Sequence, residues 1–143
     1  MKSDTEIIVR YAETDQMKVV HHSVYPVWFE AARTDYMEQA GYPYSRIEKE
    51  GVMLPLSRLE CDFKEGARYG DVVLIKTTIA KFSPVRIELK YKAFRKSDGV
   101  LLAEGITLHA WTDENLQIIN LKKRLPDLFS LLENEFEKNK KSD

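Results

Sequence analysis

The chain contains very little cysteine: Cys61 is the only one in 143 residues. A lone cysteine excludes an intrachain disulfide and a metal site built from several cysteines. An excess of one charge is also missing, since 22 lysines and arginines nearly balance 23 acidic residues. The resulting net charge of -1 provides no general attraction for nucleic acid or for an anionic membrane surface. We therefore expect neither of them as a partner.

Long apolar stretches are absent as well, because no run approaches the ~20 residues that a membrane-spanning helix needs. The first ten residues, MKSDTEIIVR, lack the apolar core and cleavage site of a signal peptide. These absences predict a cytoplasmic protein. With 43% hydrophobic and 31% charged residues, the composition is that of a globular chain, and its length suits one domain over residues 1–143. We expect the lysine-rich end after about residue 137 to be mobile.

Two common catalytic motifs are also missing. The sequence has neither the G-x-S-x-G element of serine hydrolases nor a glycine-rich phosphate loop. Cys61 falls in a predicted strand, where a small buried side chain explains it better than a nucleophile does. His109 falls in another predicted strand and is expected to be packed or to lie in an interface. We therefore expect the catalytic residues elsewhere in the chain.

Residues 11–33, YAETDQMKVVHHSVYPVWFEAAR, bring charged, histidine and aromatic side chains together. The apolar spacing from Val24 to Ala40 predicts a helix that is buried on several sides. Ser23 is expected to cap its start, Pro26 suits its first turn and Gly41 suits the position after its end. The first turn of a helix offers unpaired N–H groups and a partial positive charge, which can hold an oxyanion or a polarised carbonyl. A carboxylate just before such a turn is a hydrolytic arrangement.

Two acids, Glu13 and Asp15, precede this helix, and we expect only one of them to face its start. Asp15 is the candidate, although an aspartate in a polar loop often only caps the loop or lies exposed. His21 and His22 might form a metal site with Asp15, but adjacent histidines diverge and no further ligands occur at a recognisable spacing. No metal is therefore expected. A histidine at the helix start could orient substrate, act as an acid at neutral pH or cap the helix through its backbone.

The rest of the chain predicts a sheet. Four long strands, joined by turn residues as antiparallel hairpins, are expected at 53–63, 71–82, 85–95 and 100–111. A short strand is expected at 5–11, a short helix at 43–50, and an amphipathic helix from Pro126 to about Phe136. The strand at 85–95 alternates apolar and charged residues, so one face of the sheet needs a cover. Only the helix at 24–40 is long and apolar enough, which predicts an α+β fold with a five-stranded antiparallel sheet around one central helix.

The string Tyr11-x-x-Thr14-Asp15-x-x-x-x-Val20-x-His22-x-x-Tyr25, followed by a long helix and four strands, resembles a known family. It is similar to the 4-hydroxybenzoyl-CoA thioesterase-like branch of the hotdog-fold acyl-CoA thioesterases. The resemblance implies hydrolysis of acyl-CoA thioesters without metal or cofactor. It implies that Asp15 is the nucleophile or general base and that the backbone amide of His22 polarises the thioester carbonyl. It also implies a homodimer or homotetramer with the site between subunits.

The same resemblance implies substrate contacts. Tyr25 is expected to shape the acyl pocket. Some relatives hold the nucleotide phosphates with basic residues at the turn that here reads FSPV, and Lys81 and Arg86 flank this turn. Two other functions stay open from the sequence. One is hydrolysis of thioesters carried by an acyl carrier protein, and the other is acyl-CoA binding without catalysis.

Overall fold

The computed structural model describes residues 3–142, which form one antiparallel sheet and the helices around it. The strands lie in the order β1-β3-β4-β5-β2. Their bounds are β1 (Ser3–Ile8), β2 (Leu56–Phe63), β3 (Val72–Phe82), β4 (Arg86–Arg95) and β5 (Leu101–Ala110). The helices are η1 (Tyr11–Glu13, a 3₁₀ turn), α1 (Val24–Ala40), α2 (Tyr44–Lys49), α3 (Leu121–Arg124) and α4 (Pro126–Ser142).

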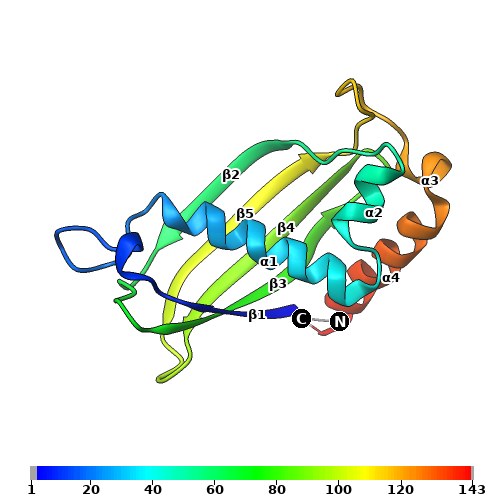
Figure 1. Ribbon diagram of the computed structural model, residues 1–143. Helices are drawn as coiled ribbons and strands as arrows, with labels where there is room; N and C mark the ends of the chain where they lie inside the picture. The colour runs from blue at the N-terminus through cyan, green and yellow to red at the C-terminus, as the bar shows by residue number, and fades with distance from the viewer. Residues whose placement is uncertain (1–2, 143) are drawn as a thin grey trace.

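The sheet curves around α1, which runs across one of its faces, while α2, α3 and α4 gather at one end (Figure 1). The predicted α+β hotdog architecture, a five-stranded antiparallel sheet around a central helix, is confirmed. Within residues 3–142, no helix is both long enough and apolar enough to span a membrane.

Several predicted bounds differ from the structure. The first strand ends at Ile8 because the chain turns into η1, and β2 begins at Leu56, just after Pro55, which has no N–H to donate to a ladder. The short α3 was not predicted, and its N-cap is Asn120, whose side chain accepts a hydrogen bond from the Lys123 amide. Helix α4 continues to Ser142 rather than ending near Phe136.

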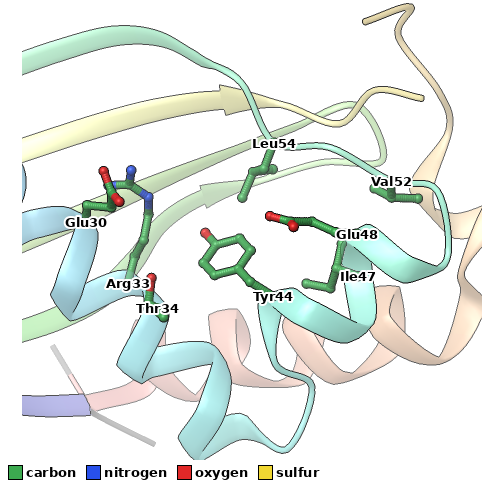
Figure 2. A pocket seen from close by; sticks show the side chains of 8 residues that line it. All are labelled: Glu30, Arg33, Thr34, Tyr44, Ile47, Glu48, Val52 and Leu54. Carbon is green, nitrogen blue, oxygen red and sulfur yellow. The ribbon is translucent and has the colours of Figure 1, made fainter. Parts of the chain in front are cut away.

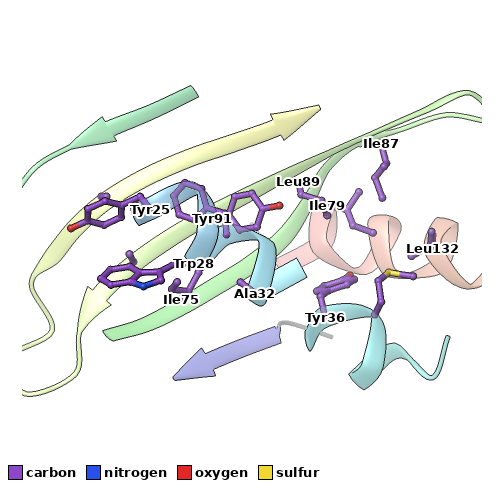
Figure 3. Close-up of a cluster of buried hydrophobic side chains, with 14 of the residues drawn as sticks. Tyr25, Trp28, Ala32, Tyr36, Ile75, Ile79, Ile87, Leu89, Tyr91 and Leu132 are labelled. Carbon is purple, nitrogen blue, oxygen red and sulfur yellow. The ribbon is translucent and has the colours of Figure 1, made fainter. Parts of the chain in front are cut away.

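The core forms where α1 packs against the sheet (Figure 3). The ring of Phe29 stacks on that of Tyr91 in β4, with centroids 4.5 Å apart and planes inclined by 10°. On β5, a Cβ atom at Gly105 would lie 2.3 Å from a ring carbon of Phe29, so only glycine lets the helix approach this closely. The predicted alternation of β4 is confirmed for Ile87, Leu89, Tyr91 and Ala93, which are all buried; Val85 precedes the strand and is exposed.

Candidate active site

Asp15 lies in a tight loop between η1 and α1. Its amide donates to the Val19 carbonyl and its carbonyl accepts from the Lys18 amide, each at 2.9 Å. Lys18 has φ +66°, a left-handed conformation that is uncommon for residues other than glycine. One carboxylate oxygen of Asp15 accepts a hydrogen bond from the Met17 amide at 2.8 Å. The other oxygen has no hydrogen-bond partner among the described residues, so Asp15 both caps its loop and keeps an oxygen available.

Asp15, His22 and Tyr25, the three residues predicted near the helix start, line one pocket of about 250 Å³. The opposite wall comes from the end of β2 and the loop after it, at residues 63–66. The two walls pack closely: the Val20 amide donates to the Ala67 carbonyl at 2.8 Å. A Cβ atom at Gly66 would lie 2.5 Å from a methyl carbon of Val19. The pocket is therefore built between two closely packed segments of the chain, one of which continues into α1.

One backbone donor just before α1 is left without an acceptor in the described part of the chain. Ser23 occupies the N-cap position as predicted, but its side chain makes no capping hydrogen bond. Its backbone is already helical, with φ -68° and ψ -15°, and its hydroxyl pairs with Nδ1 of His21 at 2.8 Å. The backbone N–H of His22 has no acceptor within residues 3–142. It lies at the start of a 17-residue helix, where the helix dipole favours negative charge.

Glu13 has a different role, which the sequence did not predict. It is 7% exposed, and its carboxylate accepts hydrogen bonds from Nε1 of Trp28 at 3.0 Å and from the Arg10 amide at 2.8 Å. Burial alone would raise the pKa of Glu13, but these hydrogen bonds and the Arg10 side chain together hold it below its ordinary value. Glu13 joins the loop to α1 and does not line the pocket. No spacing in the sequence signals this contact.

Tyr25 forms the apolar wall between the pocket and the core. It is 2% exposed, and its ring meets those of Trp28 and Phe63 edge to face. Burial raises its pKa to about 12, so it is a neutral phenol at physiological pH. Phe63, by contrast, is 53% exposed at the mouth of the pocket.

Lys81 and Arg86 are not near this pocket within one chain. Ile8 pairs with Val72, which places the Asp15 loop at the start of β3. Lys81 pairs with Glu88 at the other end of the same strand. Strand β3 has 11 residues and so spans roughly 35 Å. These two basic residues can reach a ligand at Asp15 only from another copy of the chain.

The remaining candidates show no catalytic geometry. The rings of His21 and His22 lie against each other, with centroids 4.1 Å apart. Among residues 3–142, no three His, Cys, Asp or Glu side chains are grouped to hold a metal ion. Cys61 is half-buried, and burial, aided by the charge of Asp62, raises its pKa to about 11, so the thiol stays protonated. His109 is packed, as one of the two predicted alternatives had it, with 0% exposure.

A second pocket, of about 230 Å³, opens between α1, α2 and the segment before β2 (Figure 2). Its lining includes Arg33, a residue that the sequence did not single out. Arg33 lies within the predicted helix, and the residue pattern of this helix does not indicate that Arg33 faces a cavity.

Comparisons with known proteins identify the family of the chain. The profile of the thioesterase-like superfamily matches residues 9–130. A Bacillus subtilis protein, YneP, provisionally named an acyl-CoA thioesterase, is 34% identical over 126 residues, covering 87% of this chain and 91% of its own. The solved structure of a DHNA-CoA thioesterase from Staphylococcus aureus superposes with a TM-score of 0.93 at 34% identity, over 99% of this chain and 95% of that one. A Thermus thermophilus protein, TT1821, superposes with a TM-score of 0.86 at 44% identity, over 93% and 98%. The chain belongs to the thioesterase-like superfamily of hotdog proteins.

Proposed function

We propose that this protein hydrolyses acyl-CoA thioesters to a free acid and CoA, with Asp15 as the catalytic carboxylate. One observation carries the proposal. Asp15, which keeps one carboxylate oxygen without a partner, and His22, whose backbone N–H has no acceptor in residues 3–142, line one pocket beside a helix start. The relatives named as CoA thioesterases support the substrate class.

The chemistry follows from these two groups. The thioester carbonyl oxygen accepts a hydrogen bond from the His22 amide, which stabilises the negative charge that develops on this oxygen. Asp15 then either attacks the carbonyl carbon to form an anhydride, which water hydrolyses, or removes a proton from an attacking water. In both cases the C–S bond breaks and CoA leaves as a thiolate that takes up a proton. Tyr25 shapes the wall against which the acyl group lies.

We also propose that the active form is a homodimer or homotetramer joined through β2. This strand is an edge of the sheet and carries three exposed apolar residues: Leu56 at 49%, Leu59 at 40% and Phe63 at 53%. An exposed apolar edge invites pairing with a second chain. Antiparallel pairing of two β2 strands would bring the partner's turn between β3 and β4 to the end of the sheet where Asp15 lies. Lys81 and Arg86 would then serve the CoA phosphates of the neighbouring chain.

A thiol-release assay across a panel of acyl-CoA esters tests the proposal. Turnover of at least one ester is expected, and ligand binding without thiol release by any ester would favour a non-catalytic acyl-CoA-binding role instead. Arabidopsis thaliana ATL3, an acyl-acyl carrier protein thioesterase, is 27% identical over 88% of this chain and 66% of its own. Matched CoA and carrier-protein esters in the same assay therefore separate the two carriers. The cytoplasmic location stays a prediction.

A further inference from the structure

The last residue of β4, Arg95, joins three segments that are separate in the sequence. Its side chain is 18% exposed. Nε donates a hydrogen bond to a carboxylate oxygen of Asp71 at 3.1 Å, Nη1 to one of Asp98 at 2.9 Å and Nη2 to the Gly66 carbonyl at 3.0 Å. These acceptors lie just before β3, in the turn between β4 and β5, and in the loop between β2 and β3.

The Gly66 contact connects Arg95 to the candidate active site. Gly66 lines the wall of the pocket that faces Asp15. The two walls meet one residue further on, where the Val20 amide donates to the Ala67 carbonyl at 2.8 Å. The turn between β4 and β5 and the loop between β2 and β3 lie at the same end of the sheet as the loop between η1 and α1 (Figure 1). Arg95 therefore supports this wall from the side of the sheet.

Asp71 extends the network to the segment that leads to Asp15. The oxygen of Asp71 that binds Arg95 also accepts from the Arg68 amide at 2.9 Å, which fixes the turn before β3. The backbone carbonyl of Asp71 accepts from the Val9 amide at 2.9 Å. Val9 lies between β1 and η1, from which the chain enters the Asp15 loop. Arg95 thus bonds one wall directly and reaches the other through Asp71.

The hydroxyl of Tyr25 lies near the same network. Burial raises the pKa of Tyr25, while contact with the Ala67 backbone and the charge of Arg95 act in the opposite direction. These influences place the hydroxyl beside the wall loop and within range of the guanidinium. The apolar wall that Tyr25 forms therefore shares its support with the loop.

An arginine suits this position because of its shape. A guanidinium is planar and its N–H groups point in fixed directions, so one side chain can hold three acceptors at set positions. Asp71 and Asp98 are charged acceptors, which strengthens two of the three contacts. Within residues 3–142 the Gly66 carbonyl has no donor other than Arg95. A change at Arg95 therefore leaves this part of the wall without its anchor.

We propose that Arg95 is a positioning residue for the reaction: it sets the spacing between the two walls of the pocket and so holds the thioester in the geometry that Asp15 requires. The inference rests on the proposed thioesterase function. Arg95 does not line the pocket, so it acts on the substrate only through the residues that it binds. A looser wall reduces the fraction of bound substrate that is correctly placed, which lowers kcat more than it changes KM.

The test is Arg95→Met, which keeps much of the side-chain length and removes every donor. Its kcat per folded molecule should fall by about tenfold or more, with KM changed by less than about threefold, because a small misplacement of reacting groups is costly. The assay temperature stays well below the melting temperature of the variant. Lys96→Met is the matched control, since this neighbouring cation pairs with Glu6 on β1 and does not line the pocket. It should keep kcat within about threefold of the parent.

Two further variants separate positioning from a general loss of stability. Arg95→Lys should retain more activity than Arg95→Met, because an ammonium can still bind one of the acceptors. Asp71→Ala should also lower kcat. The double variant Arg95→Met with Asp71→Ala should lose less than the product of the two single losses, because both residues act through one network.

Hydrogen exchange of the Val20 amide, followed by NMR, reports on the contact between the walls without any turnover. Its protection should fall in Arg95→Met. The Met53 amide donates to the Thr112 carbonyl near the other end of the sheet and should keep its protection.

Parental kcat, or unchanged protection of Val20, in a folded Arg95→Met variant overturns the inference while the thioesterase function stands. If Arg95→Met does not fold, parental kcat in both Arg95→Lys and Asp71→Ala overturns it. An absence of hydrolysis for every ester removes the proposed function. In that case, unchanged protection of Val20 also rejects the support of the wall by Arg95.

Discussion

The indole Nε1 of Trp28 donates a hydrogen bond of 3.0 Å to the buried carboxylate of Glu13. This contact fixes the loop that carries Asp15 against the helix whose start faces the pocket. The two acids of the segment therefore have separate roles. Glu13 attaches the loop to α1, while Asp15, two residues later, lines the pocket and keeps one carboxylate oxygen without a hydrogen-bond partner among the described residues.

Glu13→Gln should destabilise the protein by about 1–3 kcal/mol, because one amide oxygen replaces two acceptor oxygens and a donor is left facing the Trp28 indole. Urea denaturation at pH 7 measures this. Glu65→Gln, at an exposed position, is the control and should change little. Identical unfolding midpoints for the parent and Glu13→Gln would show that the buried contact has no energetic role.

His109 should make the protein sensitive to mild acid. Burial, with a further contribution from the Arg33 charge, lowers the pKa of His109 from 6.5 to about 4. Between these values the unfolded chain binds a proton that the folded chain does not, so stability is full above pH 6.5 and falls toward pH 4. The loss should reach roughly 2–3 kcal/mol at the acid end.

Urea unfolding of the parent and of His109→Gln, from pH 7 to pH 4, isolates this loss as the difference between their slopes. His21→Gln, at an exposed histidine, should keep the parental slope. If His109→Gln shows the same pH dependence as the parent, the buried histidine titrates normally in the folded state.

The contact between α1 and β5 leaves no room for a methyl group. Gly105→Ala should destabilise by about 1–3 kcal/mol through overpacking against Phe29. A smaller residue should relieve the clash, so Gly105→Ala with Phe29→Leu should lose less than the sum of the two single changes. Thermal melts of the four proteins measure the coupling. If the stability losses of the two substitutions simply add, α1 can move away from β5 without cost and the close contact is not a constraint.

The β2 edge should control assembly. Light scattering should give the mass of a dimer or a tetramer, and Leu59→Lys should shift it toward monomer and reduce activity, because a buried unpaired charge is unfavourable. Ile8→Lys tests the opposite edge, at another exposed apolar residue, and should leave the mass unchanged. A fully active monomeric parent would remove the shared-site proposal.

The sequence predicted features that repeat along the chain and missed those that depend on distant side chains. The alternation in β4 and the apolar spacing of α1 predicted a sheet covered by a helix. The structure contains both the sheet and the covering helix. The contact of Glu13 with Trp28 and the pocket at Arg33 were missed, because neither residue type signals its partner across the fold. The sequence correctly placed Ser23 at the N-cap, but it did not predict that the Ser23 hydroxyl pairs with the neighbouring His21 ring and not with the helix backbone.

The central claim is that Asp15 carries the reaction, and kcat for Asp15→Asn on the best acyl-CoA ester tests it most directly. The substitution keeps the size and removes the charge. Glu65→Gln is the matched control, because Glu65 is another carboxylate that lines the same pocket. Asp15→Asn should lower kcat by at least ~10²-fold while folding normally, and Glu65→Gln should stay within about tenfold of the parent. Near-parental kcat in a folded Asp15→Asn variant would contradict the account.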